Sequence, residues 1–428
     1  MRFRLVPEDL RSGFMQSAVA PTRTAERGQD PSTRRSLAAL FCAQAASTSA
    51  LTTSVSLSSI VATHITGSAS ASGVPSSINL VVASLSAFLA GLLMARYGRK
   101  AGMLTGYVVG AVGAALGCAF ALAHNFPGFL FGSALVGMAQ AVVLQGRYAA
   151  ADFVPAARRG RVVGVILFGA VVGAAIAAGL TPFLQQIAAK RGLDAIELGW
   201  GQSALLLAVG ALLITVLFRN PAVSSETSGG LRLSEFLAAA GQPAIRLGIF
   251  YLVVGQAVMV MLMSLFPIHA LHHGHQLGTI SAIITIHIAG MYALAWLTGG
   301  LVDRFGASWV GATGGLMLVG GAILSAVETS ALGLGIALCL IGLGWNFCFV
   351  TGSALLAKNL EPGIRVRFEG TADVLVWLCA GASTLGGGVL VGVYDYPVVG
   401  VMGGLAATGL LLVTGLSRSR MHQPAPAR

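Results

Sequence analysis

The decapeptide GLLMARYGRK at residues 91–100 returns in altered form as GGLVDRFGAS at residues 299–308. In both copies a glycine opens the segment, an arginine follows five residues later, and a second glycine stands two residues beyond that arginine. Internal repetition of this kind indicates a chain built from two similar halves. The matched pairs are Gly91 with Gly299, Arg96 with Arg304, and Gly98 with Gly306.

A second set of matches extends the repeat further along the chain. The pairs are Gly137 with Gly344, Asp152 with Asn359, Pro155 with Pro362, and Arg158 with Arg365. The two copies run in the same direction, because the matched positions come in the same order. Parallel repeats are typical of secondary carriers whose halves rock about a site between them.

The composition shows which solvent the chain is built for. Hydrophobic residues make up 55% of it and charged residues only 10%, whereas a soluble domain is about a quarter charged. Uncharged stretches of about 20 residues, the length of a helix that crosses a bilayer, recur between short polar breaks. We therefore predict an all-α integral membrane protein with twelve transmembrane helices in two pseudo-symmetric six-helix halves.

Gly, Pro and charged residues mark the expected limits of these spans. The first six are 37–62, 75–95, 101–123, 127–151, 162–186 and 200–218; the second six are 246–270, 277–298, 308–327, 331–357, 371–392 and 394–416. The expected domains are a cytoplasmic N-terminal tail at 1–36, an N-terminal half at 37–218, a central cytoplasmic loop at 219–245, a C-terminal half at 246–416 and a cytoplasmic tail at 417–428.

The positive charges predict the orientation. All Lys and Arg residues except Arg147, Lys190 and Arg191 fall in the two tails or in the even-numbered connections between spans. Loops that stay in the cytoplasm keep such cations, so we expect both termini there. The net charge of +11 is scattered over these loops and forms no basic face interleaved with aromatic residues, which argues against a nucleic-acid partner.

The sequence resembles the major facilitator superfamily in its two repeated segments. The loop between the second and third helices of that family carries Gly-x-x-x-Asp-Arg-x-Gly-Arg-Lys; GLLMARYGRK fits this pattern except at Ala95, and GGLVDRFG fits it with Asp303. RYAAADFVPAARRGRVVG after the fourth span and HIAGMYALAWLTGGLVDRFG through the eighth resemble a bacterial subgroup of mostly unassigned substrate. The resemblance covers nearly the whole chain and implies a carrier in the bacterial cytoplasmic (inner) membrane.

The resemblance also implies a cytoplasmic gate. In the family, the carboxylate of this loop lies at the N-terminus of a helix in the opposite half, where the helix dipole favours an anion. Asp303 would then cap the fifth span near Arg161 when the carrier faces outward, whereas Ala95 cannot make the symmetric contact. We expect Arg147, near the cytoplasmic end of the fourth span, and Asp152 beyond it to serve structure or gating rather than substrate contact.

A replacement for the missing carboxylate is available at the start of the eleventh span. Glu369 and Asp373 could pair there with Arg96, Arg99 or Lys100; the alternative is that both are ordinary acids of a helix N-terminus. The complete expected gate consists of Gly91, Arg96, Gly98, Arg99, Lys100, Arg147, Asp152, Gly299, Asp303, Arg304, Gly306, Glu369 and Asp373.

Ionisable groups inside a membrane are costly and therefore functional candidates. The first and seventh spans have no acid and offer Gln44 and Gln256 instead. His287, in the middle of the eighth span, could carry a proton because imidazole titrates near neutral pH; the alternative is a neutral histidine bonded to a neighbouring helix. Trp345 and Asn346 of the tenth span could line the substrate cavity or pack against other helices.

Histidines gather at the outer end of the seventh span, where helical spacing places His269 on one side with His272 or His273, and His275 follows. Two imidazoles on one face are what a divalent metal requires, so a vestibule for a transition metal is an alternative. Histidine tracts in exposed loops are also often incidental.

Taken together, the sequence predicts a secondary transporter rather than an enzyme. We expect a monomer that moves a small molecule by alternating access, driven by protons, with export favoured over uptake and no cofactor. A Gly-x-x-x-x-Gly-Lys-Ser/Thr loop for ATP is absent from the sequence. The alternatives are a transition-metal transporter using the outer histidines, and a carrier fold that serves as a membrane enzyme or sensor.

Overall fold

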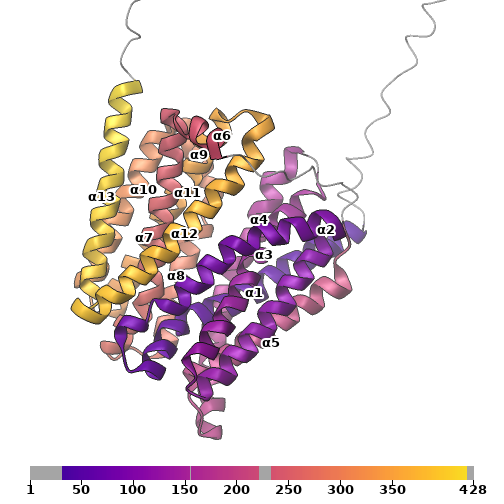
Figure 1. Ribbon diagram of the computed structural model, residues 1–428, viewed down its shortest axis with the longest axis vertical. Helices are drawn as coiled ribbons and strands as arrows, with labels where there is room; N and C mark the ends of the chain where they lie inside the picture. Colours follow the sequence, from indigo (N-terminus) through magenta and orange to yellow (C-terminus); the bar gives the residue numbers. More distant parts are fainter. Residues whose placement is uncertain (1–30, 155, 221–232, 422–428) are drawn as a thin grey trace, which may run out of the picture.

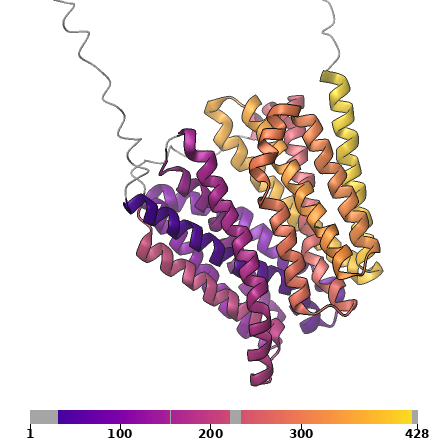
Figure 2. The ribbon, with the colours of Figure 1, turned by 180° about the vertical axis from the view of Figure 1, so that it is seen from behind.

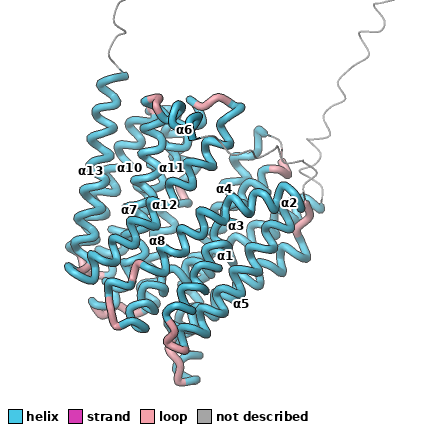
Figure 3. The backbone as a smooth tube through the Cα atoms, in the orientation of Figure 1, coloured by secondary structure: helices cyan, strands magenta, loops and turns pink. Residues whose placement is uncertain are grey.

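The computed structural model describes residues 31–154, 156–220 and 233–421, and the elements within them are helical (Figure 3). The N-terminal half comprises α1 (Pro31–Thr66), the 3-10 turn η3 (Ala69–Ala71), α2 (Val74–Leu122), α3 (Phe126–Ala151), α4 (Ala156–Arg191) and α5 (Ala195–Leu217). After α6 (Leu233–Ala240), the C-terminal half comprises α7 (Pro243–His272), α8 (Leu277–Tyr292), α9 (Ala295–Phe305), α10 (Ala307–Val327), α11 (Ala331–Asn359), α12 (Pro362–Tyr394) and α13 (Tyr396–Met421). Parts of the expected tails and of the central loop lie outside the described residues.

The helices form two bundles that lie side by side in both views (Figures 1 and 2). Helices α1 to α5 pack around a core that includes Tyr107, Phe129 and Trp200. Helices α7 to α13 pack around a second core that includes Tyr251 and Phe266. Each bundle therefore has an apolar core of its own.

The described residues make twelve helical passes, in addition to the short helix α6, when α2, which turns at Gly98, counts as two and the broken pair α8 and α9 counts as one. Among the described residues, nine helices are long and apolar enough to cross a membrane, and ten if the broken pair is included. The other two passes are the first part of α2 and α1, whose Ser- and Thr-rich stretch lowers its hydropathy. The fold is thus that of a multi-pass membrane protein.

An even number of passes leaves the start of α1 and the end of α13 at one end of the bundles. We call this the terminal end; Gly98 and Gly306 lie at its turns. The opposite end, where α1 finishes after His64 and α2 finishes before His124, is here called the distal end.

Several hydroxyl groups of α1 are bonded within that helix, whereas the buried hydroxyls of Ser49, Ser56 and Ser59 have no partner among the described residues. Ser47, Ser54 and Thr63 donate to carbonyl oxygens three residues earlier, and Thr53 and Ser58 to carbonyl oxygens four residues earlier. This pattern satisfies polar side chains without help from a neighbouring helix. A helix of modest hydropathy can therefore be accommodated in an apolar setting.

The repeated segments form the same turn in both halves. Gly98 inside α2 has φ 85° and ψ 164°, and Gly306 between α9 and α10 has φ 85° and ψ 150°. This backbone region is essentially restricted to glycine. The matched glycines of the repeat are therefore explained by matched backbone geometry.

The eighth span, expected to be continuous over 277–298, is broken. Helices α8 and α9 meet at an angle of 43°. The side-chain amide of Asn346 donates to the carbonyl oxygen of Met291 (2.6 Å), and the hydroxyl of Thr298 donates to Asn346 Oδ1 (2.6 Å). A side chain that takes over a backbone hydrogen bond in this way is a known cause of helix kinks, and the partner lies on α11, so periodicity within 277–298 gave no sign of it.

Two other elements differ from the expected limits. The amphipathic helix α6 lies in the stretch assigned to the central loop, where Phe236 stacks on Phe368 of α12 with ring centroids 4.6 Å apart. Helix α12 begins at Pro362 rather than at 371, because proline at the first helical position is pre-organised for a helix. Hydropathy identifies only the apolar part of such a helix.

The two halves meet closely toward the distal end. Ser77 Oγ donates to the carbonyl oxygen of Gly381 (2.8 Å), and Gly392 of α12 lies against Ser70 of η3. Glycine at such a position lets backbones approach where a side chain would prevent contact. The distal contact is completed by an apolar cluster that spans the halves, with Leu57 and Ile60 of α1 against Ile268 of α7.

Toward the terminal end the two bundles diverge, as the separation of α9 and α6 from α2 and α4 in Figure 1 shows. Asp303 and Arg304, at the terminal end of α9, are exposed. Among the described residues, the hydrogen bonds that join the halves lie from mid-helix, at Ser84 with Val374, to the distal end. The conformation is therefore closed distally and open toward the terminal end.

Candidate functional site

The structure brings Gln256 of α7 and Trp345 of α11 into direct contact. The indole Nε1 of Trp345 donates a hydrogen bond of 2.6 Å to Gln256 Oε1, and both side chains are buried. The pair joins α7 to α11 within the C-terminal half. Further along α7, Leu271 packs toward Leu57 and Ile60 of the opposite half.

Aromatic rings surround this pair. Trp345 stacks on Phe349 with ring centroids 4.8 Å apart and planes inclined by 19°, and Tyr292 of α8 meets the edge of Trp345 at 5.7 Å. Phe349 and Tyr292 are only partly buried. Aromatic rings favour stacked and edge-on contacts with other rings. The hydrogen bond to the Gln256 amide fixes the orientation of the Trp345 indole. We call Tyr292, Trp345, Phe349 and Gln256 the aromatic cluster.

The N-terminal half contributes polar groups that lie apart from the aromatic cluster. Gln44 of α1 donates through Nε2 to Thr48 Oγ1 (3.0 Å) and lies beside Gly169 of α4. Gln44 and Gln256 are thus placed on different halves, and no hydrogen bond between them is seen among the described residues.

A small pocket between the halves carries hydroxyl groups. It is bounded by Thr52 and Ser56 of α1, Thr181 of α4 and Ser281 of α8. The hydroxyls of Thr181 and Ser281 are hydrogen-bonded across the halves at 3.0 Å, whereas Ser56 Oγ is buried and has no partner among the described residues. The Ser56 hydroxyl is therefore available as an additional hydrogen-bond partner at the contact between the halves.

His287 is enclosed within the C-terminal half. It is completely buried, and its Nδ1 lies 2.7 Å from the carbonyl oxygen of Leu338 on α11. Its own carbonyl group packs against Gly342 of the same neighbouring helix. This geometry favours the alternative of a histidine bonded to a neighbouring helix, and it gives the expected proton role no support.

Asn346 takes part in packing rather than in the aromatic cluster. Its hydrogen bonds to Met291 and Thr298 hold the break between α8 and α9. Of the two candidates on the tenth span, Trp345 therefore belongs to the aromatic cluster and Asn346 to the framework.

The cations of the first repeated loop are engaged within the N-terminal half. Arg99 forms an ion pair with Asp152 at 3.0 Å, and Lys100 Nζ donates to the carbonyl oxygen of Thr215 at 2.7 Å. Arg96 is exposed and lies over the ring of Tyr97 at 5.3 Å. In this conformation Arg99 and Lys100 therefore have other partners than the acids of α12.

The remaining gate residues are placed as follows. Glu369 is partly buried and Asp373 is exposed on α12, each with a contact of its own. Asp303 is exposed, whereas the side chains of Arg147 and Arg161 lie outside the described part of the structure. The expected locks of Asp303 and of the two α12 acids concern a carrier closed at the terminal end, so for this open conformation they stay predictions.

The outer histidines pack against one another and against neighbouring groups. His269 is buried and stacks on Tyr396 with ring centroids 4.5 Å apart, and His273 Nδ1 lies 2.9 Å from the His269 carbonyl oxygen. His275 contacts the carbonyl oxygen of Thr329 at 2.7 Å, and His272 is exposed. In the described part of the chain, no group of three or more His, Cys, Asp or Glu side chains could hold a metal ion, so the metal alternative gains no support.

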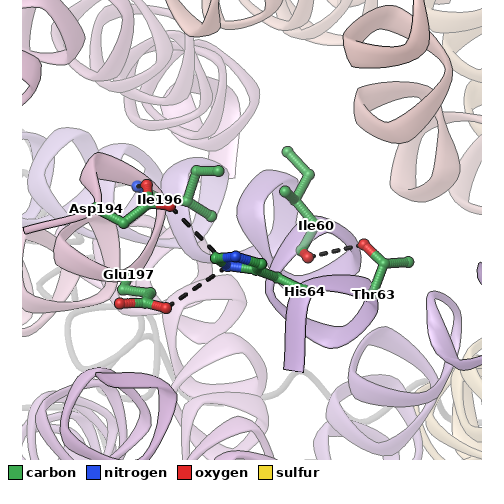
Figure 4. A network of polar contacts seen from close by, with 6 residues as sticks. All are labelled: Ile60, Thr63, His64, Asp194, Ile196 and Glu197. Atoms are coloured by element: carbon green, nitrogen blue, oxygen red, sulfur yellow. Dashed lines mark hydrogen bonds and ion pairs between the residues drawn. The ribbon is translucent and has the colours of Figure 1, made fainter. Parts of the chain in front are cut away.

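A titratable cluster lies at the distal end of the N-terminal half, and sequence reasoning missed its two acids, Asp194 and Glu197 (Figure 4). His64 Nδ1 lies 3.7 Å from Glu197 Oε1 and 4.0 Å from Asp194 Oδ2, and His124 meets the His64 ring edge-on at 5.8 Å. Asp194 caps α5 by accepting a hydrogen bond from the Ile196 amide. The signal was the spacing of Asp194 and Glu197, which is that of a capping box and places the helix start before residue 200.

Comparison with known proteins gives one family. The family model described as "Major Facilitator Superfamily" matches residues 37–384. The chain is 30% identical over 403 residues to "Uncharacterized MFS-type transporter YdeG" of Bacillus subtilis, covering 90% of this chain and 93% of that protein. It is 26% identical over 348 residues to "Riboflavin transporter RfnT" of Brucella anthropi, covering 80% and 86%.

A solved structure shows the same fold. The crystal structure of a D-xylose-proton symporter superposes with a TM-score of 0.66 at 18% identity, covering 88% of this chain and 96% of that chain. At this identity the likeness concerns the fold alone.

Proposed function

This chain belongs to the major facilitator superfamily, and we propose that it carries a small organic solute with a planar ring across the bacterial cytoplasmic membrane by alternating access. Its standing as a multi-pass membrane transporter, and not an enzyme, follows from the family. Proton drive, export rather than uptake, cytoplasmic termini and a monomeric state are further parts of the proposal.

The aromatic cluster is the observation that carries the substrate class. Trp345 and Phe349 present stacked rings, Tyr292 adds an edge, and Gln256 supplies an amide held by the indole N–H. Such a site offers a ring both dispersion and one directed polar contact. The 26% identity to a protein described as a riboflavin transporter supports a flat heterocycle as a first test compound.

The open terminal end supports alternating access. A carrier must close one end of its substrate path while the other is open, and here the distal end is closed by Ser77 with Gly381 and by Leu57 with Ile268. Proton drive is supported by the titratable groups of the distal end.

The test is flux in proteoliposomes with riboflavin as the first probe and a panel of other ring-bearing and non-aromatic solutes. Trp345→Leu and Gln256→Ala should lower the apparent affinity for a transported ring compound by about tenfold or more, because stacking and a buried hydrogen bond together exceed about 1.4 kcal/mol. Gln276→Ala, on an exposed distal residue, is the matched control.

The outcomes separate the parts of the proposal. Flux confined to non-aromatic solutes, or equal affinity in wild type and Trp345→Leu, would refute the substrate class. Flux that persists when the proton gradient is collapsed would refute proton drive. Absence of solute-dependent flux for the whole panel would favour the sensor alternative.

A further inference from the structure

Glu197 is the most deeply buried acid of the distal end. It is 5% exposed, stands in the first turn of α5, and accepts no hydrogen bond from a described donor; its near neighbour is the imidazole of His64 at 3.7 Å. The His64 side chain is 48% exposed, so the imidazole reaches the distal medium. The pair therefore joins a buried carboxylate to an imidazole that the medium can protonate.

A buried carboxylate without hydrogen bonds is unfavourable unless it is protonated or paired with a cation. When His64 carries a proton, the imidazolium compensates Glu197. When His64 is neutral, Glu197 must take up the proton itself or gain water. Only 5% of Glu197 is exposed, so fuller hydration of its carboxylate requires the surrounding contacts to loosen, which links the charge state of the pair to packing at the distal end.

The other titratable and charged groups around Glu197 come from three elements. Asp194, at the cap of α5, adds a second negative charge near His64. His124, between α2 and α3, faces both Glu197 and His64, and the thiol of Cys118 on α2 is also within electrostatic reach of Glu197. Among the described groups the two acids thus face two imidazoles, which can hold a variable number of protons.

The pair adjoins the apolar cluster that closes the distal end. Ile60 lies one helical turn before His64, and Ile196 immediately precedes Glu197; Figure 4 draws both isoleucines beside the pair. Both pack in the cluster with Leu57 of α1 and with Ile268 of the opposite half. Movement of α1 away from α5 would therefore displace the residues that join the halves.

We propose that His64 and Glu197, flanked by Asp194 and His124, form a proton-binding site whose occupied state keeps the distal end closed. The proposal rests on alternating access as proposed above, but needs no particular solute. A bound proton compensates the buried charge and keeps α1 against α5; loss of the proton leaves Glu197 to be hydrated, which favours opening.

The first experiment measures the proton directly. Purified protein in lipid nanodiscs is titrated from pH 4 to 9 by infrared difference spectroscopy, which resolves the C=O stretch of protonated carboxyl groups and imidazole bands. Glu197→Gln should remove a component of the carboxyl signal, and His64→Ala should shift the titration of that component. Glu328→Gln, at the distal end of the other half, is the control and should leave the Glu197 component unchanged.

The second experiment measures opening. Spin labels at Ser68→Cys and Gln276→Cys, one on each half, report the distal separation in a background whose five native cysteines are replaced. In wild type the distal-open population should rise with pH by about tenfold. Glu197→Gln should stay closed at every pH, and His64→Ala should open at lower pH than wild type.

The proposal is overturned if the infrared spectra contain no component that depends on Glu197, or if Glu197→Gln keeps the pH dependence of wild type. A pH-dependent distance that survives Glu197→Gln but is lost in His269→Gln would assign the switch to the other half instead. Neither measurement uses a transported solute, so failure of the riboflavin assay would leave this test intact.

Discussion

Alanine at the two matched glycines separates backbone strain from displacement of a neighbour. At Gly306 a new Cβ would have no heavy atom within 4 Å. Gly306→Ala should therefore lower the free energy of unfolding only through backbone strain at φ 85°, by about 1–3 kcal/mol. At Gly98 the Cβ would also lie 2.7 Å from Asn220 Nδ2. Asn220 Oδ1 accepts the Lys100 amide hydrogen at 2.7 Å, so Gly98→Ala should cost about 0.5–1.5 kcal/mol more.

Thermal unfolding in one detergent, followed by intrinsic fluorescence at a fixed scan rate, measures this difference. Gly98→Ala should have a lower midpoint than Gly306→Ala, and in an Asn220→Gly background the extra loss at Gly98 should disappear. Equal losses at the two glycines in the native background would refute the role given to Asn220. A loss at neither would refute the assignment of strain to these turns.

Two further substitutions test the framework. Asn346→Leu leaves the buried Met291 carbonyl without its side-chain donor, while the Thr298 hydroxyl keeps the Leu294 carbonyl oxygen as an acceptor. The substitution should destabilise the protein by about 1–3 kcal/mol, measured as a lower unfolding midpoint. A midpoint within error of wild type would show that the helix break does not depend on this amide. Gly392→Ala places a methyl group against Ser70 and should raise the distal-open population seen by spin-label distances; unchanged distances would show that η3 moves aside instead.

Most of the architecture could be predicted because each of its signals lies within one short segment of the sequence. Hydropathy depends on composition along one segment, and the turn at Gly98 depends on one backbone conformation, so both could be inferred from the sequence. The family and the helical membrane fold were confirmed. The break after α8 escaped because its cause, Asn346, stands on another helix.

The site was less predictable because its contacts join distant segments. Gln256 and Trp345 were separate candidates, and only the packing of α7 on α11 makes them a hydrogen-bonded pair. His287 drew attention as the titratable group in mid-span, yet its partner is a backbone carbonyl of α11. His64 and Glu197 carry no motif that links them, since their proximity comes from the packing of α1 against α5.

The self-bonded hydroxyls of α1 bear on how fast this carrier can change shape. Helices that exchange hydrogen bonds with their neighbours must break them before they slide, which raises the barrier to movement. Ser54, Thr63 and Ser58 keep their bonds inside α1 whatever its neighbours do. Helix α1 can therefore shift against α4 and α7 with little loss of polar contacts, which lowers the barrier to this movement.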